Sequence, residues 1–107
     1  MIYEYRVYTV KPGRMEALHR RFTTATLPLF EKYNMKVIGF WEPKDQQGKV
    51  LAYMLAFDSE EHMQKAWSAF GEDPAWQAAF AESEKDGPLE EKTEGTIFYP
   101  TSYSPLQ

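Results

Sequence analysis

The sequence predicts an α+β domain with the β-α-β-β-α-β order and the antiparallel sheet of a ferredoxin-like subunit. Three observations lead to this fold class. A long amphipathic segment separates the first two expected strands, so the chain must cross over between them. Only a short polar loop, residues 43–48, separates the second strand from the third, which is typical of an antiparallel hairpin. A second helical segment then leads to one last strand.

The first strand is expected over Ile2–Val10, with side chains alternating between two faces. Neither face resembles ordinary exposed surface. One carries Tyr3, Tyr5, Val7 and Thr9, and the other carries Ile2, Glu4, Arg6, Tyr8 and Val10. A single layer of helices covers only one side of a sheet, so the second side requires a partner, which we expect to be another copy of the chain. The alternation does not tell which face Glu4, Arg6 and Tyr8 take.

Lys11-Pro12-Gly13 predicts a tight turn, and a helix is expected over Arg14–Tyr33. Pro28 is expected to kink this helix, because it removes the backbone bond to the carbonyl of Thr24. Asn34, which tolerates left-handed backbone, is the expected end. The apolar positions recur at helical spacing: Met15, Leu18, Phe22, Ala25, Thr26, Leu29 and Tyr33.

Strands are expected over Met35–Glu42 and Lys49–Phe57. The second of these is apolar on both faces, which in an antiparallel sheet predicts burial on both sides. Leaving either row of side chains in water would expose an apolar patch larger than monomers usually tolerate. The pattern therefore predicts a homodimer in which two sheets face each other and bury more than about 1,200 Å² in total.

Asp58 is the expected cap of a second helix that ends at Gly71. Asp73-Pro74 predicts a further helix, with Asp73 as its cap and proline at its first position. The last strand is expected over Thr96–Pro100, at a sheet edge, because proline cannot donate to a ladder. Residues 101–107 are expected to form a C-terminal tail, and 1–107 a single domain.

Composition excludes several classes of function. The formal net charge is −4, and a small basic cluster (Lys11, Arg14, His19, Arg20 and Arg21) fits a solvated helix face, so nucleic acid is not an expected partner. Cysteine is absent, which excludes disulfides and thiolate sites. No apolar run approaches the roughly 18 residues of a membrane span, and no secretory pattern opens the chain. We expect a cytoplasmic protein.

The chain resembles the NIPSNAP family within the dimeric α+β barrel superfamily. The resemblance covers nearly the whole chain and is carried by Tyr3–Tyr8 followed by Lys11-Pro12-Gly13, by Gly39-Phe40-Trp41, by Tyr53–Ser59 and by Asp73-Pro74-Ala75-Trp76. It implies a ferredoxin-like subunit whose sheet packs on the sheet of a second subunit, with the helices outside. It implies no agreed catalytic residues, so the catalytic set is unknown.

Six residues are candidates for binding a small ligand between the helices and the sheet: Arg6, Tyr8, Tyr53, His62, Trp67 and Trp76. Large aromatic side chains can line a flat pocket, and buried polar groups must find partners. Each candidate also has a structural interpretation, as core, interface or helix flank. His19 and His62 are the only histidines, and no spacing of His or carboxylates suggests a metal site. No phosphate loop, GxSxG, HExxH or calcium loop is present.

The leading interpretation is a homodimeric NIPSNAP-like protein of unknown biochemical role that binds a small apolar or aromatic ligand or acts as an accessory module. No cofactor is predicted. One alternative is a cofactor-independent oxygenase or isomerase of an aromatic or enolisable substrate, in which Arg6 or a tyrosine would stabilise an enolate and a histidine would accept the proton. Another is a haem-binding protein with His19 or His62 as ligand. The sequence does not decide whether the protein is an enzyme.

Overall fold

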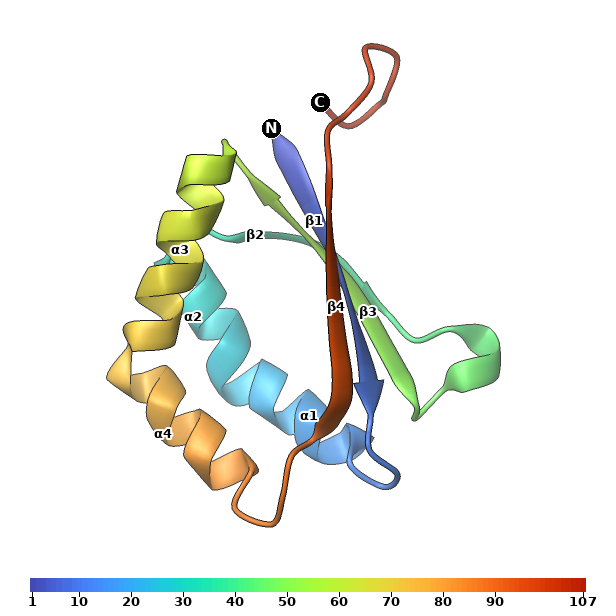
Figure 1. The fold of residues 1–107 in the computed structure, drawn as a ribbon, viewed down its shortest axis with the longest axis vertical. Helices are drawn as coiled ribbons and strands as arrows, with labels where there is room; N and C mark the ends of the chain where they lie inside the picture. Colours follow the sequence, from blue (N-terminus) through green and yellow to red (C-terminus); the bar gives the residue numbers. More distant parts are fainter.

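The computed structural model describes residues 1–107 (Figure 1). Its elements follow the predicted order. They are β1 (Ile2–Val10), α1 (Met15–Arg21), η1 (Phe22–Thr26), α2 (Leu27–Lys32), β2 (Lys36–Trp41), η2 (Lys44–Gln46), β3 (Val50–Phe57), α3 (Glu60–Glu72), α4 (Pro74–Ser83) and β4 (Glu90–Phe98). No helix is long and apolar enough to cross a membrane.

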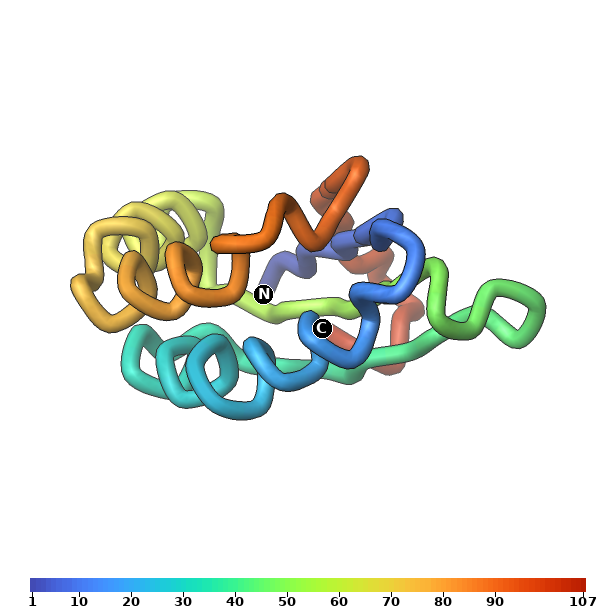
Figure 2. The backbone as a smooth tube through the Cα atoms, turned by 90° about the horizontal axis from the view of Figure 1, so that it is seen from below, coloured from blue at the N-terminus to red at the C-terminus, as the bar shows by residue number.

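The four strands form one sheet in the order β2-β3-β1-β4, and every neighbouring pair is antiparallel. This order is the split βαβ arrangement, so the predicted ferredoxin-like fold class is confirmed. The helices α1 to α4, with η1, lie on one side of the sheet, and η2 lies in the loop between β2 and β3 (Figure 1). The two helical segments run beside each other when the chain is seen from below (Figure 2). The opposite face of the sheet carries no helix.

The first helical segment is continuous, but it is not a single α-helix. A π-helical turn, η1, lies directly before α2 and Pro28, where the kink is expected. There the N–H of Leu27 donates to the carbonyl of Phe22, and the Thr26 hydroxyl donates to the carbonyl of Arg21 at 3.3 Å. A π turn widens the helix, and we attribute it to the proline ring, which would otherwise meet the carbonyl four residues earlier. The segment ends as predicted, with Asn34 in the left-handed conformation at φ 57°.

The second helical segment begins one residue later than predicted. The cap of α3 is Ser59, not Asp58, because the Ser59 hydroxyl accepts the N–H of His62 at 3.0 Å. The imidazole of His62 in turn accepts the N–H of Asp58, the residue before the cap, at 3.0 Å. This bond resembles the return bond of a capping box but is shifted by one residue. The cap predicted for α4 is confirmed, since Asp73 accepts the N–H of Ala75 and Pro74 opens the helix.

The last strand is longer than predicted. β4 begins at Glu90 and ends at Phe98, whereas the residues alone predict a start at Thr96. The missed part, Glu90–Gly95, is rich in charged residues that are poor strand formers. It becomes a strand because it pairs with β1, where tertiary pairing overrides local preference. The predicted edge position is confirmed, as β4 is the outer strand beside β1.

Strand register settles which face each side chain takes. Residues directly opposite each other in an antiparallel pair point to the same side. Arg6 lies opposite Tyr53, and Glu4 lies opposite Leu55. Tyr53 and Leu55 are fully buried under the helices. Glu4, Arg6 and Tyr8 therefore point towards the helices and not towards the open face.

The open face carries the other row of side chains, including Tyr5, Val7, Met54, Trp41 and Phe98. Trp41 is 50% exposed and Phe98 44% exposed. Tyr5 stacks on Phe98, with ring centroids 6.2 Å apart. The C-terminal tail reaches back to β1, because the Tyr3 hydroxyl donates to the carbonyl of Gln107. A mostly apolar strip between the tail and the hairpin loop thus remains uncovered within the single chain.

A buried carboxylate ties α2 to the junction of α3 and α4. Asp73 accepts Lys32 Nζ at 2.8 Å and the hydroxyl of Tyr33, in addition to its capping bond. The hydrogen bonds from Lys32, Tyr33 and Ala75 lower the pKa of Asp73 to about 2 from an ordinary value of 3.8. All three partners favour the ionised form.

This carboxylate predicts a defined acid sensitivity. A group whose pKa is lower in the folded state stabilises the fold above its unfolded pKa, and that stabilisation disappears as the pH falls through the folded pKa. We therefore expect Asp73 to lose its contribution between about pH 4 and pH 2. Urea unfolding of the wild type and of Asp73→Asn, compared at pH 7 and pH 3, checks this. The stability gap should narrow at pH 3, and a constant gap would contradict the assignment.

Candidate functional site

A cavity of about 290 Å³ lies between the helices and the sheet. Aromatic side chains from both layers dominate its wall: Phe22, Phe30, Trp67, Phe70, Trp76 and Phe80 from the helices, and Tyr8 and Tyr53 from the strands. Five of the six candidate residues line it, namely Arg6, Tyr8, Tyr53, Trp67 and Trp76. The sixth, His62, does not, because its imidazole is engaged in the cap of α3. The structure thus brings these five side chains together, while their role in binding stays a prediction.

The polar side chains of the sheet form a connected chain of hydrogen bonds. Arg6 Nη1 donates to Glu4 Oε2 at 3.2 Å, Arg6 Nε donates to the Tyr53 hydroxyl at 2.8 Å, and Arg6 Nη2 approaches the Tyr8 hydroxyl at 3.4 Å. The two tyrosine oxygens are 2.8 Å apart. Glu4 also accepts the indole N–H of Trp67 at 2.7 Å. This last bond fixes α3 to β1 across the cavity.

The guanidinium of Arg6 lies over aromatic rings as well as between hydrogen-bond partners. Its Cζ is 4.6 Å from the centroid of the Trp67 ring, within the range of a cation–π contact. Burial by itself would lower the pKa of Arg6, but the oxygens of Tyr53 and Tyr8 and the carboxylate of Glu4 outweigh burial and hold this pKa above the ordinary arginine value. Arg6 is therefore a fixed cation.

Burial raises the pKa of Tyr53 well above that of an ordinary phenol; the nearby Tyr8 adds to the shift, while Arg6 opposes it. Tyr53 is consequently a neutral hydroxyl that carries its proton at physiological pH. Its side chain is fully buried, so the proton must be donated to a group inside the protein. The partner within reach is Tyr8, because Arg6 Nε can only donate to Tyr53 and cannot accept.

The direction of this proton has a consequence for Tyr8. If Tyr53 donates to the oxygen of Tyr8, the proton of Tyr8 itself is not used in the tyrosine pair. Tyr8 accepts from its neighbours and keeps one O–H to donate. Since Tyr8 lines the cavity, this O–H is available to an acceptor atom inside it. The arrangement can therefore hold an oxygen of a bound molecule from the sheet side.

The other end of the cavity contains a second arginine, Arg21, which the basic-cluster interpretation places on a solvated face. That expectation is wrong for Arg21, whose side chain is only 5% exposed. Arg21 Nη2 donates to Glu90 at 2.6 Å, and Nη1 donates to Glu84 at 3.3 Å and to the Ser83 hydroxyl at 3.2 Å. Its Cζ lies 5.2 Å from the centroid of the Trp76 ring. The residue joins α1 to the end of α4 and the start of β4.

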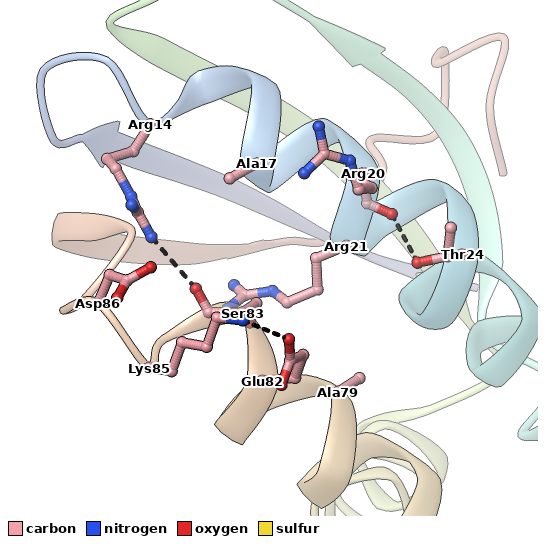
Figure 3. A pocket seen from close by; sticks show the side chains of 10 residues that line it. All are labelled: Arg14, Ala17, Arg20, Arg21, Thr24, Ala79, Glu82, Ser83, Lys85 and Asp86. Atoms are coloured by element: carbon pink, nitrogen blue, oxygen red, sulfur yellow. Dashed lines mark hydrogen bonds and ion pairs between the residues drawn. The ribbon is translucent and has the colours of Figure 1, made fainter.

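Figure 3 shows the neighbouring groove between α1 and α4, where Arg14 donates to the carbonyl of Ser83 at 3.2 Å. The groove is lined mostly by charged and polar side chains of both signs. Ser83 thus receives hydrogen bonds from Arg14 and Arg21, which hold the C-terminal end of α4 against the first helix. These contacts hold α1 and α4 together beside the cavity.

Sequence reasoning missed Arg21, Glu90 and Phe30 as residues of this site. Phe30 lies four residues after Thr26, so helical spacing could have found it. Glu90 was hidden because the strand that carries it was not recognised. The histidines were named but lie elsewhere: His19 is exposed, 3.1 Å from Glu42, and His62 caps α3. No group of three or more His, Cys, Asp or Glu side chains gathers in a way that could hold a metal ion.

Comparison with known proteins agrees with the fold. A NIPSNAP protein from Agrobacterium tumefaciens is 23% identical, with a TM-score of 0.86 over 99% of this chain and 98% of that one. An uncharacterized NIPSNAP domain protein from Burkholderia xenovorans is 21% identical, with a TM-score of 0.84 over 98% and 99%. SnoaB, a cofactor-independent oxygenase from Streptomyces nogalater, was solved as a mutant and is 12% identical, with a TM-score of 0.67 over 97% and 96%.

The search of curated proteins gave no match. At these identities, similarity to solved structures shows the fold alone. The family model described as NIPSNAP, however, matches residues 3–105, nearly the whole chain. The resemblance found in the residue patterns is thereby confirmed, and the chain belongs to the NIPSNAP family.

Proposed function

We propose that the protein binds a small, flat, uncharged molecule in the cavity between its helices and its sheet, with an acceptor oxygen of that molecule bound by Tyr8. The observation that carries the proposal is the pair of Tyr8 and Tyr53 oxygens, 2.8 Å apart at the wall of an aromatic cavity. Because buried Tyr53 donates within this pair, the O–H of Tyr8 is left for a ligand. Pockets that bind small molecules combine such apolar walls with a few placed polar groups.

Size and charge narrow the class of ligand. The volume of about 290 Å³ is at the lower end of ligand pockets, which suits a molecule of one or two rings. Arg6 is paired with Glu4, and Arg21 with Glu84 and Glu90, so the cavity wall has no excess positive charge to attract an anion. A neutral ketone or aldehyde on an aromatic ring matches these features better than a carboxylate does.

Removing the hydroxyl of Tyr8 is therefore expected to weaken binding of a neutral aromatic ketone. With 1-acetonaphthone as the probe, Tyr8→Phe should lose affinity by about 3- to 10-fold, the value of one hydrogen bond. Naphthalene, which has no acceptor, should bind wild type and variant alike. Quenching of Trp67 and Trp76 fluorescence reports binding, in a Trp41→Phe background that removes the tryptophan outside the cavity.

The control variant is Tyr103→Phe, which removes an identical hydroxyl from a side chain that is 86% exposed. It should leave the affinity for the ketone unchanged. Equal affinities of wild type and Tyr8→Phe for the ketone would contradict the proposed role of Tyr8. No quenching by any of the probes would contradict binding in the cavity.

No histidine lies in the wall of the cavity, and both the enzyme alternative and the haem alternative require one there. Each needs a histidine at the site, as proton acceptor or as axial ligand, and neither His19 nor His62 lines the cavity. The similarity to SnoaB shows a shared fold and does not favour an oxygenase. We propose binding without a cofactor, and we keep the cytoplasm as the proposed location.

We further propose that the protein is a homodimer joined through the open face of its sheet. Support comes from the uncovered strip around Tyr5, Met54 and Phe98, which a second copy would remove from water. Fully burying a large apolar side chain contributes about 1.5–3 kcal/mol. Two facing sheets would give each subunit the second layer that its helices do not provide.

A charge in the middle of this strip is expected to separate the subunits. Met54 lies on a central strand and points to the open face, so Met54→Glu would place a carboxylate inside the proposed interface. Sedimentation should give twice the chain mass of 12.5 kDa for the wild type and a single chain mass for the variant. Ser68→Glu, on the exposed side of α3, is the matched control. A monomeric wild type at micromolar concentration would refute the dimer.

A further inference from the structure

A second hollow lies outside the helix–sheet cavity, where the first helical segment meets the edge strand β2. It is a groove of about 300 Å³, open at the surface. Its apolar wall consists of Phe22, Leu27, Phe40, Trp41 and Leu51. Trp41 lies across Gly39, where a Cβ atom would be 2.6 Å from the indole ring, and it remains half exposed. Only the absence of a side chain at Gly39 allows the indole this position.

The rim of the groove carries a fixed carboxylate. Glu42 Oε1 accepts the N–H of Gly48 at 2.7 Å, and Glu42 Oε2 lies 3.1 Å from His19 Nε2. The bond from Gly48 and the neighbouring His19 lower the pKa of Glu42, so this side chain is ionised at neutral pH. The glutamate is anchored at both oxygens, and it does not swing freely in solvent.

The free polar atoms of the groove are acceptors. A carboxylate accepts only, so His19 donates its Nε2–H to Glu42. Thr23 donates its hydroxyl proton to the carbonyl of Arg20 at 3.1 Å, which leaves its oxygen as an acceptor. The groove therefore combines aromatic side chains, the carboxylate of Glu42 and an acceptor oxygen on Thr23. This polarity is opposite to that of the cavity, where Tyr8 and Arg6 offer donors.

We infer that this groove binds an organic ammonium ion with an aromatic or aliphatic body, such as an arylalkylamine. The ammonium group donates to Glu42, while the apolar body packs against Phe40 and Leu51, with Trp41 at the outer edge of the groove. Cations are attracted to the faces of tryptophan and phenylalanine, and a charge-assisted bond to a carboxylate is among the stronger hydrogen bonds. The inference concerns a site separate from the proposed ligand cavity.

Three probes of the same shape test the inference: 2-phenylethylammonium, 2-phenylethanol and phenylacetate. NMR titration follows the indole N–H signals of the three tryptophans, with the Trp41 signal assigned through Trp41→Phe. The ammonium should shift Trp41 and leave Trp67 and Trp76 in place. It should bind on the order of tenfold more tightly than the alcohol, as expected for a hydrogen bond to a charged group. Phenylacetate should not bind.

Glu42→Gln removes the charge while keeping an oxygen for the N–H of Gly48, so it should lower the ammonium affinity on the order of tenfold and leave the alcohol unchanged. Thr23→Arg fills the mouth of the groove with a cation at an exposed position and should abolish binding, which keeps the test valid if Glu42→Gln fails to fold. Glu61→Gln, an exposed carboxylate on α3, is the control and should change nothing.

Equal affinities for ammonium, alcohol and carboxylate would overturn the inference, as would shifts confined to Trp67 and Trp76. The latter result would place the probe in the helix–sheet cavity. Conversely, the titration of Tyr8→Phe with 1-acetonaphthone tests only the helix–sheet cavity. The two sites are thus distinguished both by the tryptophan that reports binding and by the variant that removes it.

Discussion

Replacing Phe22 with alanine is expected to lower the free energy of unfolding by about 3–5 kcal/mol, the cost of deleting a buried aromatic ring. Phe22 is 5% exposed and lies in the π-helical turn, at the point where the first helical segment presses on the sheet. Its ring meets Tyr53 at 5.4 Å and Phe40 at 5.2 Å between centroids, both edge to face. Phe22 also lines both the helix–sheet cavity and the groove beside Glu42, so we expect its removal to connect the two.

Urea unfolding followed by circular dichroism measures this loss. Tyr103→Ala removes an aromatic ring that is 86% exposed and serves as the control, with an expected change within about 0.5 kcal/mol. If the midpoint of Phe22→Ala equalled that of the control, the helix would face the sheet differently from the structure. A cost near 1 kcal/mol would instead mean that Leu27 and Phe40 close the space.

The sequence predicts the fold well where the pattern of side chains has one strong interpretation. β1 and β3 are runs rich in β-branched and aromatic residues bounded by turn signals, and the predicted bounds of β1 are those of the structure. Asn34 and Asp73 are recognisable because turn and cap chemistry is local. β4 is a different case, since its charged first half becomes a strand through hydrogen bonds to β1 that no local pattern encodes.

The candidate site was harder to predict because both faces of β1 mix polar and apolar residues. Only register against β3 puts Arg6 beside Tyr53, and register depends on the whole sheet. His62 could not be separated from the ligand candidates, because a histidine near an apolar stripe and a histidine in a cap have the same sequence signature. Arg21 was predicted to be exposed because arginine is rarely buried. Its partners Glu84 and Glu90 lie more than sixty residues later in the sequence, so no local pattern reveals the ion pairs.

Removing the charge of Arg21 is the second change that we expect to lower the free energy of unfolding strongly. Arg21→Met keeps most of the side-chain volume and removes the charge, which leaves Glu84 and Glu90 without the cation between them. Removing one partner of a buried ion pair costs about 3–5 kcal/mol, because the remaining charge stays poorly solvated. The two glutamate side chains are 15% and 16% exposed, so water can reach them in part, and we expect a loss of about 3 kcal/mol.

A double-mutant cycle with Glu90→Gln separates the pairing from the packing. If the loss in Arg21→Met comes from an unpaired carboxylate, adding Glu90→Gln should restore part of the stability, with a coupling of about 0.5–3 kcal/mol between the two changes. Arg20→Met is the matched control, because Arg20 precedes Arg21 on the same helix but is exposed, and it should cost no more than about 0.5 kcal/mol. Equal losses for Arg20→Met and Arg21→Met would show that the buried network contributes nothing. A large loss without recovery in the double variant would assign the effect to the contact of Arg21 with Trp76, and thus to packing of α4 over the cavity.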